Sequence, residues 1–350
     1  MTVAVSGDSI TFPDNSVQAT APKVGMVNRV INGGMTIDQR NAGASVSLVS
    51  GGGNAYPADR WYVENQTDGT ATTQQVSDAP TGFSNSIKYT VTATDASLAS
   101  DQAAWIQHRI EGFNFADMLY GTANAQTVAV SFLVKSSVTG TFGVALANSA
   151  YNRGYPASFT VSAANTWEQK TVVIAGDTTG TWVGSTNGIG VRVSFCMAAG
   201  SARSAASGAW GAGVILGVSS QVNLMATNGA TFQVTGVQLE KGSTATSFDY
   251  RPYGTELGLC QRYFEVVTQG TSAACLLSGV LVGASNWLNL YYKQTKRVTP
   301  TVALTSNGSW ANATPSINPS IDQCGFNNGT TYFYNNGTIN TPVLSISAEL

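Results

Sequence analysis

The residues best suited to covalent chemistry lie near the start of the chain, in the stretch VAVSGDSIT. A strand that ends in Gly-Asp-Ser would present Ser9 as a nucleophile for acyl transfer, which needs a neighbouring base, normally a histidine held by a carboxylate. The sequence has one histidine, His108 in WIQHRIEG, and no late Asp-x-x-His segment. The pattern therefore disfavours an esterase and favours a turn around Ser9.

Carboxylates suggest a second chemistry, because hydrolysis of a glycosidic bond needs two suitably spaced Asp or Glu side chains. Glu111, Glu168 and Glu240 each lie next to a predicted strand, where solvent-facing carboxylates are ordinary, and nothing in the sequence pairs them. We also find no run of short repeats that would predict a β-helix. We therefore assign no catalytic residue and expect no enzyme, with a glycan depolymerase of the glycoside hydrolase type as the alternative.

Aromatic side chains suggest non-covalent chemistry, because flat rings stack on the apolar faces of sugars while polar side chains bind the hydroxyls. Trp61, Trp105 and Trp167 lie beside regular strand patterns, which predicts packing roles. Other aromatic residues have Gly, Ser, Thr or Asn neighbours, which predicts exposure and ligand contact. These are Trp182, Trp210, Trp287 and Trp310, with Tyr332 and Tyr334.

Composition restricts the partners. The 350 residues carry a formal charge of −2, so there is no basic field and no counterion-release argument for nucleic acid. The longest weakly apolar run, 273–284, is far shorter than the roughly 20 residues of a membrane-spanning helix. The N-terminus has no secretory pattern. We therefore expect neither nucleic acid binding nor membrane insertion.

Cysteine and histidine spacing predicts no metal site. The four cysteines are far apart without a CxxC pair, so buried free thiols are expected rather than zinc ligands. No Asp-rich loop of the DxDxDG kind supports calcium binding. We assign no metal and no cofactor.

Hydrophobic alternation predicts the fold class. Apolar residues recur at every second position at 87–93 and 189–197, which is typical of strands with one buried face. Further strands are predicted at 128–135, 141–146, 159–161, 171–174 and 231–239, with Gly- and Asn-rich connections. The small-residue stretch 201–213 is expected to be a loop. We therefore predict an all-β protein with a central jelly-roll sandwich.

A change of pattern follows the last of these strands. Leu257, Cys260 and Phe264 recur at helical spacing, which predicts a short connecting helix over 255–264. Asn-Gly turns on both sides of 331–334 then predict a meander of antiparallel strands, in a smaller C-terminal β domain. Its core candidates are Val302, Leu304, Val343, Leu344 and Ile346.

Three segments together resemble bacteriophage tail fibre and receptor-binding proteins: ITFPDNSVQATA at 10–21, NRVINGGMTIDQRNAG at 28–43, and QLEKGSTATSFDYRPYGTELGLCQRYF at 238–264. The strands between the second and third resemble a carbohydrate-binding module. The resemblance covers about the first three quarters of the chain. Two positions depart from the family pattern: Asn15 stands where Gly is usual, and Gly34 replaces the usual acidic residue.

The resemblance implies a virion protein, assembled in the host cytoplasm. Residues 1–27 would form an extended fibre segment that attaches to other tail or capsid proteins, and 28–250 would form the jelly roll. Residues 251–350 would form the connecting helix and a β tip that contacts host surface polysaccharide. A purely structural capsid or tail decoration protein is a further alternative.

The N-terminal segment and the connecting helix predict a homotrimer. A lone hairpin is marginal in water, and an isolated helix of about three turns is unstable, so both are expected to need partner chains. Packing of the helix on its own sandwich is the alternative. The predicted trimer contacts are Val5, Ile10, Phe12, Leu257, Cys260 and Phe264.

Overall fold

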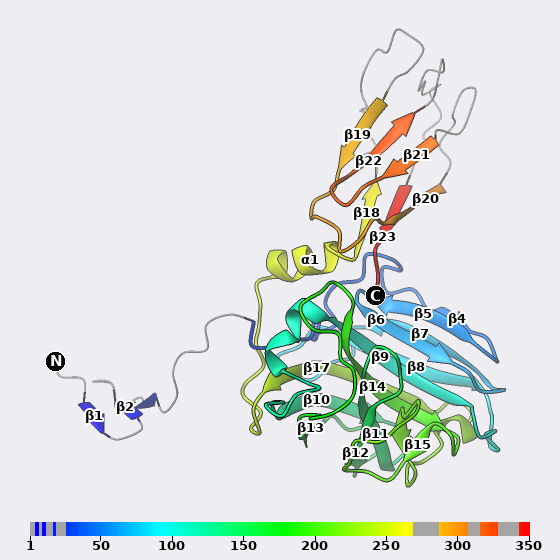
Figure 1. Ribbon diagram of the computed structural model, residues 1–350. Helices are drawn as coiled ribbons and strands as arrows, with labels where there is room; N and C mark the ends of the chain where they lie inside the picture. The colour runs from blue at the N-terminus through cyan, green and yellow to red at the C-terminus, as the bar shows by residue number, and fades with distance from the viewer. Residues whose placement is uncertain are drawn as a thin grey trace.

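The computed structural model describes residues 4–6, 9–11, 17–18, 26–268, 287–306, 316–327 and 343–350. The predicted all-β class is confirmed: a large β-sandwich, a short helix and a smaller tip of two three-stranded sheets follow one another (Figure 1). At the N-terminus, β1 (Ala4–Ser6), β2 (Ser9–Thr11) and β3 (Val17–Gln18) pair antiparallel in chain order, so the predicted hairpins are confirmed.

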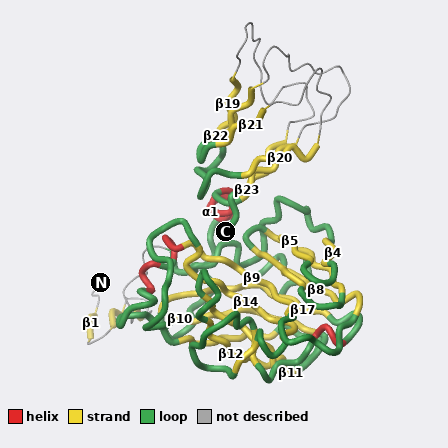
Figure 2. Tube along the Cα trace, turned by 45° about the vertical axis from the view of Figure 1, so that its right-hand side comes forward, coloured by secondary structure: helices red, strands yellow, loops and turns green. Residues whose placement is uncertain are grey.

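The sandwich consists of two six-stranded antiparallel sheets. In order, sheet I contains β13 (Glu168–Ile174), β10 (Val128–Ser136), β17 (Thr231–Lys241), β8 (Ser86–Ala93), β7 (Thr70–Val76) and β4 (Val46–Leu48). Sheet II contains β12 (Gly154–Val161), β11 (Gly140–Ala147), β14 (Ile189–Ala199), β9 (Ala103–Glu111), β6 (Trp61–Asn65) and β5 (Gly53–Ala58). The strands predicted from alternation are all present, and the two layers are visible in Figure 2.

The core fills the space between the two sheets. On β14, the buried Val191, Val193, Phe195 and Met197 belong to one large hydrophobic cluster, as their alternation predicted. Phe195 meets Phe132 of β10 edge to face at 4.9 Å between ring centroids, so aromatic contacts connect the sheets. Opposite faces of the same strands point away from this core.

The connections are short elements and loops. The residues 201–213 form the predicted loop, which contains β15 (Ser204–Ala205), and β15 pairs with β16 (Gly217–Val218). Three 3₁₀ turns complete the sandwich: η1 (Gly112–Asn114), η2 (Ala116–Met118) and η3 (Leu224–Ala226). They connect strands and contribute Met118, Leu224 and Met225 to the core.

The chain enters and leaves the sandwich at neighbouring points. The Asn28 backbone N–H donates to the Asp249 carboxylate (3.2 Å), and its side-chain amide donates to the Val237 carbonyl (2.9 Å). The Arg29 N–H donates to the Leu239 carbonyl at 2.9 Å. The first and last segments of the sandwich are therefore hydrogen-bonded to each other.

The connecting helix is shorter than predicted. Helix α1 runs from Tyr253 to Gln261, so Phe264 is not part of it but opens strand β18 (Phe264–Thr268). The spacing of Leu257, Cys260 and Phe264 predicted a helix, but Phe264 pairs with Ser347 in the tip sheet. Pairing with a distant strand determines the conformation of Phe264 more strongly than the local helical periodicity does. The predicted helix over 255–264 is therefore wrong in its last turn.

The helix packs on its own sandwich. Cys260 and Tyr263 are fully buried with Ile31 and Ile37 of the first motif, and Leu257 packs against the same cluster. Phe264 is only 6% exposed. Cys260 and Phe264 therefore leave almost no surface for a second chain, and the instability argument for the helix does not require a trimer.

The tip contains two three-stranded antiparallel sheets. One has the order β18, β23 (Val343–Ser347), β20 (Thr301–Ser306), and the other β19 (Trp287–Tyr291), β22 (Gln323–Asn327), β21 (Ser316–Pro319). The strands β22 and β23 lie in different sheets, and the predicted strand 331–334 between them is outside the described residues, so the meander stays a prediction. The Asn-Gly turns around 331–334 lie outside the described residues.

The core of the tip is small. Leu344 and Ile346 are buried as predicted, together with Tyr292 and Cys324, and Val302 packs against them. The side chains of Leu304 and Val343 lie outside the described part. Cys196 and Cys260 are buried free thiols, which confirms the prediction for these two, and Cys324 is buried as well.

Candidate functional site

The outer face of sheet II carries a connected group of polar and aromatic side chains. On β9, Ala104, Ile106 and Ile110 face the core, so Trp105, Gln107 and Arg109 face outward. The register places Gln107 between Ser194 of β14 and Tyr62 of β6, and places Arg192 opposite Arg109. We name these outward-facing residues the sheet-face band. It consists of Trp105, Gln107, Arg109, Arg192, Ser194 and Tyr62, together with Tyr56 and Tyr151.

Gln107 is the centre of the sheet-face band. Its Nε2 donates to the Tyr151 hydroxyl (2.8 Å) and to Ser194 Oγ (2.9 Å). Its Oε1 accepts from Arg109 Nε (3.0 Å) and from Arg192 Nη1 (3.2 Å). One fully buried amide therefore fixes four side chains from three different segments.

Tyrosine rings flank this centre. The Arg109 guanidinium lies over the Tyr62 ring at 4.4 Å, and the Arg192 guanidinium lies over the Tyr151 ring at 4.1 Å. Tyr56 meets Tyr62 edge to face at 5.4 Å. All three tyrosines are half-buried, so each ring is held by its neighbours and still reaches solvent.

The band keeps donors without partners. Arg109 and Arg192 are cross-strand neighbours, an unfavourable pairing of like charges, and neither has an acidic side chain as partner within the described residues. Arg192 Nε and Trp105 Nε1 are buried without a hydrogen-bond partner. Burial lowers the pKa of Arg192. Guanidinium groups without acidic partners, beside half-buried rings, suit a ligand that has hydroxyl or anionic groups and apolar faces.

Two of the predicted ligand-binding tryptophans come together elsewhere. Trp182 and Trp210 meet at 5.4 Å, nearly perpendicular, and both touch the Tyr120 ring, at 4.9 and 5.7 Å. Trp210 also meets Tyr155 of β12 at 5.3 Å. Both tryptophans are half-buried against the core, so they are less exposed than predicted. Their contact with a ligand stays a prediction.

The remaining predicted ligand residues are less well placed. Trp287 begins β19, but its side chain lies outside the described residues, as do Trp310, Tyr332 and Tyr334. The predicted packing residues Trp61 and Trp105 are buried, whereas Trp167 is half-buried. Of the predicted N-terminal trimer contacts, Val5 and Ile10 pair with each other across β1 and β2, and Phe12 lies outside the described residues.

The candidate catalytic carboxylates have structural roles. Glu111 accepts from Arg262 Nη2 at 2.7 Å and from Arg262 Nε at 3.0 Å. Glu168 accepts from Lys170 at 2.6 Å and from two backbone N–H groups. Glu240 is buried and accepts from two side chains and one backbone N–H of nearby residues. Each carboxylate is thus engaged by its own donors among the described residues.

The histidine that an esterase would need is inside the sandwich. His108 is fully buried, its Nε2 lies 3.0 Å from the Ile31 carbonyl oxygen, and its ring meets Trp61 at 5.1 Å. Burial lowers the pKa of His108 well below its usual value, so the ring is neutral. His108 therefore packs the core and cannot reach a surface serine.

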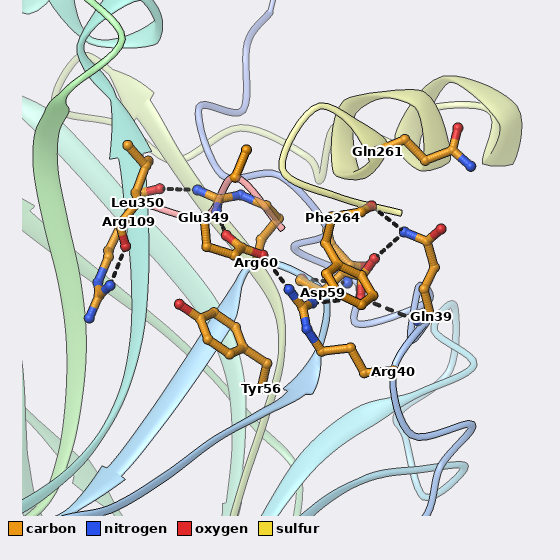
Figure 3. Close-up of polar contacts among 12 residues, drawn as sticks. Gln39, Arg40, Tyr56, Asp59, Arg60, Arg109, Gln261, Phe264, Glu349 and Leu350 are labelled. Carbon is orange, nitrogen blue, oxygen red and sulfur yellow. Dashed lines mark hydrogen bonds and ion pairs between the residues drawn. The ribbon is translucent and has the colours of Figure 1, made fainter. Parts of the chain in front are cut away.

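A cluster of charged side chains connects the C-terminal segment to the sandwich (Figure 3). Glu349 pairs with Arg60 and, at 2.9 Å, with Arg40, and Arg40 also pairs with Asp59 at 3.1 Å. Arg109 of the sheet-face band donates to the Leu350 carbonyl. We call the group Arg40, Asp59, Arg60 and Glu349 the joint cluster.

Burial changes the pKa of Asp59 in the joint cluster. It raises the pKa of Asp59 from 3.8 to about 6, although Arg40 and Gln39 act in the opposite direction. Arg60 is 2% exposed, and its guanidinium lies 3.6 Å over the Tyr263 ring. The cluster is therefore a desolvated network that joins the tip, the helix and the sandwich.

Within the described residues, no three His, Cys, Asp or Glu side chains lie together as a metal site would require. In the same part of the chain, no helix has the length and apolar character needed to span a bilayer.

The sequence matches no protein-family model and no curated protein. Its fold is similar to those of several solved structures. A putative sugar-binding protein from Bacteroides thetaiotaomicron is 12% identical, with a TM-score of 0.35 over 61% of this chain and 100% of that one. A CBM4 structure is 14% identical, with a TM-score of 0.29 over 61% and 99%. A family 11 carbohydrate-binding module from Clostridium thermocellum is 13% identical, with a TM-score of 0.29 over 53% and 90%. Likeness at this level assigns no ligand to this chain.

Proposed function

We propose that this chain is a non-catalytic virion protein of the phage tail-fibre type, which attaches to glycan on the host surface. The observation that carries the proposal is the sheet-face band. It combines three half-buried tyrosine rings with planar guanidinium donors that are fixed by one buried glutamine. Rings that stack on sugar faces and rigid donors that bind hydroxyls are the two requirements of a sugar site.

The location on a virion rests on the three fibre-like sequence segments. Two of them, 28–43 and 238–264, lie against each other and form the joint between sandwich and tip. In this proposal the protein is assembled in the host cytoplasm, residues 1–27 attach it to other tail or capsid proteins, and the chain acts as a homotrimer. Trimerisation would raise the avidity of weak sugar sites through effective concentration.

The test of glycan binding uses the full chain and a panel of purified bacterial surface polysaccharides. Tyr62→Ala removes one ring of the band, and a stacking contact is worth about 0.5–1.5 kcal/mol, so binding should weaken roughly two- to tenfold. Trp167→Ala is the matched control, because it removes a half-buried ring beside sheet I. Equal affinity of Tyr62→Ala and the unmutated chain would remove the sheet-face band from the proposal.

The tip is the second contact surface in this proposal. Trp310→Ala, Tyr332→Ala and Tyr334→Ala in the full chain should reduce adsorption to host cells while leaving the unfolding midpoint unchanged. Loops on a rigid β scaffold vary without disturbing the core, so host specificity is expected there. Unchanged adsorption of all three variants would confine recognition to the sandwich.

The absence of catalysis is tested by incubating the protein with the polysaccharide that it binds and measuring chain length. We expect no shortening. Cleavage that is lost in Glu111→Gln, Glu168→Gln or Glu240→Gln would establish the depolymerase alternative instead. A protein that neither cleaves nor binds any host polysaccharide or cell would fit a structural decoration protein.

A further inference from the structure

A pocket of about 210 Å³ lies beside α1, at the point where the chain enters and leaves the sandwich. Its walls come from the two fibre-like segments, 28–36 and 248–256, and from the short connection 82–84. We call it the joint pocket. It is separate from the sheet-face band, because no residue of that band contributes to its lining.

Aromatic rings form one wall of the joint pocket. Phe83, Phe248 and Tyr250 contact one another, with ring centroids 4.9 to 5.6 Å apart. Tyr250 is 61% exposed and Tyr253 is 65% exposed, so two tyrosine rings stand at the opening. Large aromatic side chains this exposed are uncommon on a surface that has no partner.

Polar groups are placed opposite this wall. The Asp249 carboxylate accepts the Asn28 N–H through Oδ2, and no described group donates to its Oδ1. Arg251 is already engaged, because it donates to both Glu256 oxygens and to the Val30 carbonyl, and its Nε forms an ion pair with Asp249 Oδ2 at 3.6 Å, which leaves Oδ1 of Asp249. The three charged residues of the lining sum to one negative charge, and Asp249 is the acceptor that remains available.

The absence of a side chain at Gly34 keeps the pocket open. A Cβ at this position would lie 3.6 Å from Phe83 and 3.9 Å from Phe248, which are ordinary contacts, so the fold does not demand glycine here. At the neighbouring Gly33 a Cβ would lie 2.2 Å from the Val237 carbonyl oxygen, so glycine is required for packing. The fibre-like proteins that the segment resembles carry an acidic residue in place of Gly34, and that side chain would occupy this space.

We propose that the joint pocket is a second glycan subsite, which binds a single uncharged pyranose ring. This inference rests on the proposed function. The sugar ring stacks on the exposed Tyr250 ring, and the Phe248 ring, which is nearly perpendicular to it at 71°, contacts the edge of the sugar. Adjacent hydroxyls donate to Asp249 Oδ1. A volume of about 210 Å³ is below the roughly 300–1,000 Å³ of sites for drug-sized ligands, so one ring fits and a chain of rings does not. The net negative lining disfavours acidic sugars.

The experiment uses the full chain and the methyl glycosides of glucose, galactose and mannose, with binding followed by saturation-transfer NMR. Gly34→Asn fills the pocket without removing any wall or adding charge. Gly184→Asn is the matched control, because a Cβ there meets nothing within 4 Å. Urea midpoints of both variants should stay near that of the unmutated chain.

We expect one methyl glycoside to bind and Gly34→Asn to reduce its transfer signal at least tenfold, while Gly184→Asn and Trp167→Ala retain it. Retention of the signal in Gly34→Asn overturns the joint pocket. If Tyr62→Ala alone abolishes it, the sheet-face band is the sugar site and the proposed function stands without this subsite. If neither these glycosides nor the polysaccharides bind the unmutated chain, the joint pocket and the proposed function both fail.

Discussion

Removal of the Glu349 carboxylate should separate the tip from the sandwich more strongly than its position near the C-terminal end of the sequence suggests. Glu349 is the shared acceptor for Arg60 and Arg40, and its side chain is 9% exposed. Arg40 would keep Asp59 as a partner in Glu349→Ala. Among the described residues, Arg60 would keep the Arg109 carbonyl as hydrogen-bond acceptor and the Tyr263 ring, but no carboxylate partner.

The expected magnitude follows from the burial of Arg60. Its side chain is 2% exposed, so Glu349→Ala would leave a desolvated charge without a counterion. Loss of one partner from a buried ion pair typically costs about 3–5 kcal/mol. The last residues could also detach and expose Arg60 to water. Such detachment would itself cost free energy, because it breaks the hydrogen bonds that Arg297 donates to the backbone carbonyls of Ala348 and Glu349 at 3.0 and 2.8 Å.

Urea unfolding at neutral pH measures the effect, with limited trypsin digestion to detect detachment at Arg297. Asp117→Ala is the control, since Asp117 is 47% exposed and pairs only with Arg29, where about 0.2–1 kcal/mol is expected. Glu349→Gln should fall between Glu349→Ala and the unmutated chain. Equal losses for Glu349→Ala and Asp117→Ala, with unchanged digestion, would refute the reasoning.

Three further predictions concern other parts of the molecule. Because burial raises the pKa of Asp59 from 3.8 to about 6, the folded chain retains a proton that the unfolded chain loses. The contribution of Asp59 to the free energy of unfolding should therefore rise by up to about 3 kcal/mol as pH falls from 7 to 4, and urea midpoints of the unmutated chain and of Asp59→Asn should differ in pH dependence by this amount. Trp210→Ala should lower the unfolding free energy by about 3 kcal/mol in thermal melts, since three aromatic rings contact it, and an unchanged melting temperature would contradict the packing role. Light scattering should give a mass near three times 36.4 kDa that falls in Ile10→Asp, and a monomeric unmutated chain would end the trimer prediction.

The sandwich was predictable because its signal is local. Alternation at 189–197 places one set of side chains in the core whatever the neighbouring strand is, and the structure agrees. Phe264 shows the limit of local patterns. Its spacing from Leu257 and Cys260 fits a helix, but its partner is Ser347, some eighty positions away. Tertiary pairing therefore decided the conformation there.

The sheet-face band could not be predicted from spacing. Gln107, Tyr62 and Ser194 become neighbours only through the register of β9 with β6 and β14. Alternation of Trp105, Gln107 and Arg109 with apolar residues was the available signal, and it would have identified an outward polar row on one strand. It could not show that Tyr151, from a loop, completes the band. No sequence pattern indicated the Arg60–Glu349 pair, because the two residues are 289 positions apart.

The chain leaves the sandwich close to the point where it entered. Residues 28 and 29 are hydrogen-bonded to residues 237, 239 and 249. The two ends of a domain of more than two hundred residues therefore lie next to each other. A domain attached in this way can be exchanged for another of different size without redirecting the segments on either side. Ligand preference can then change by replacement of the whole sandwich domain, while the helix and the tip stay attached at the same point.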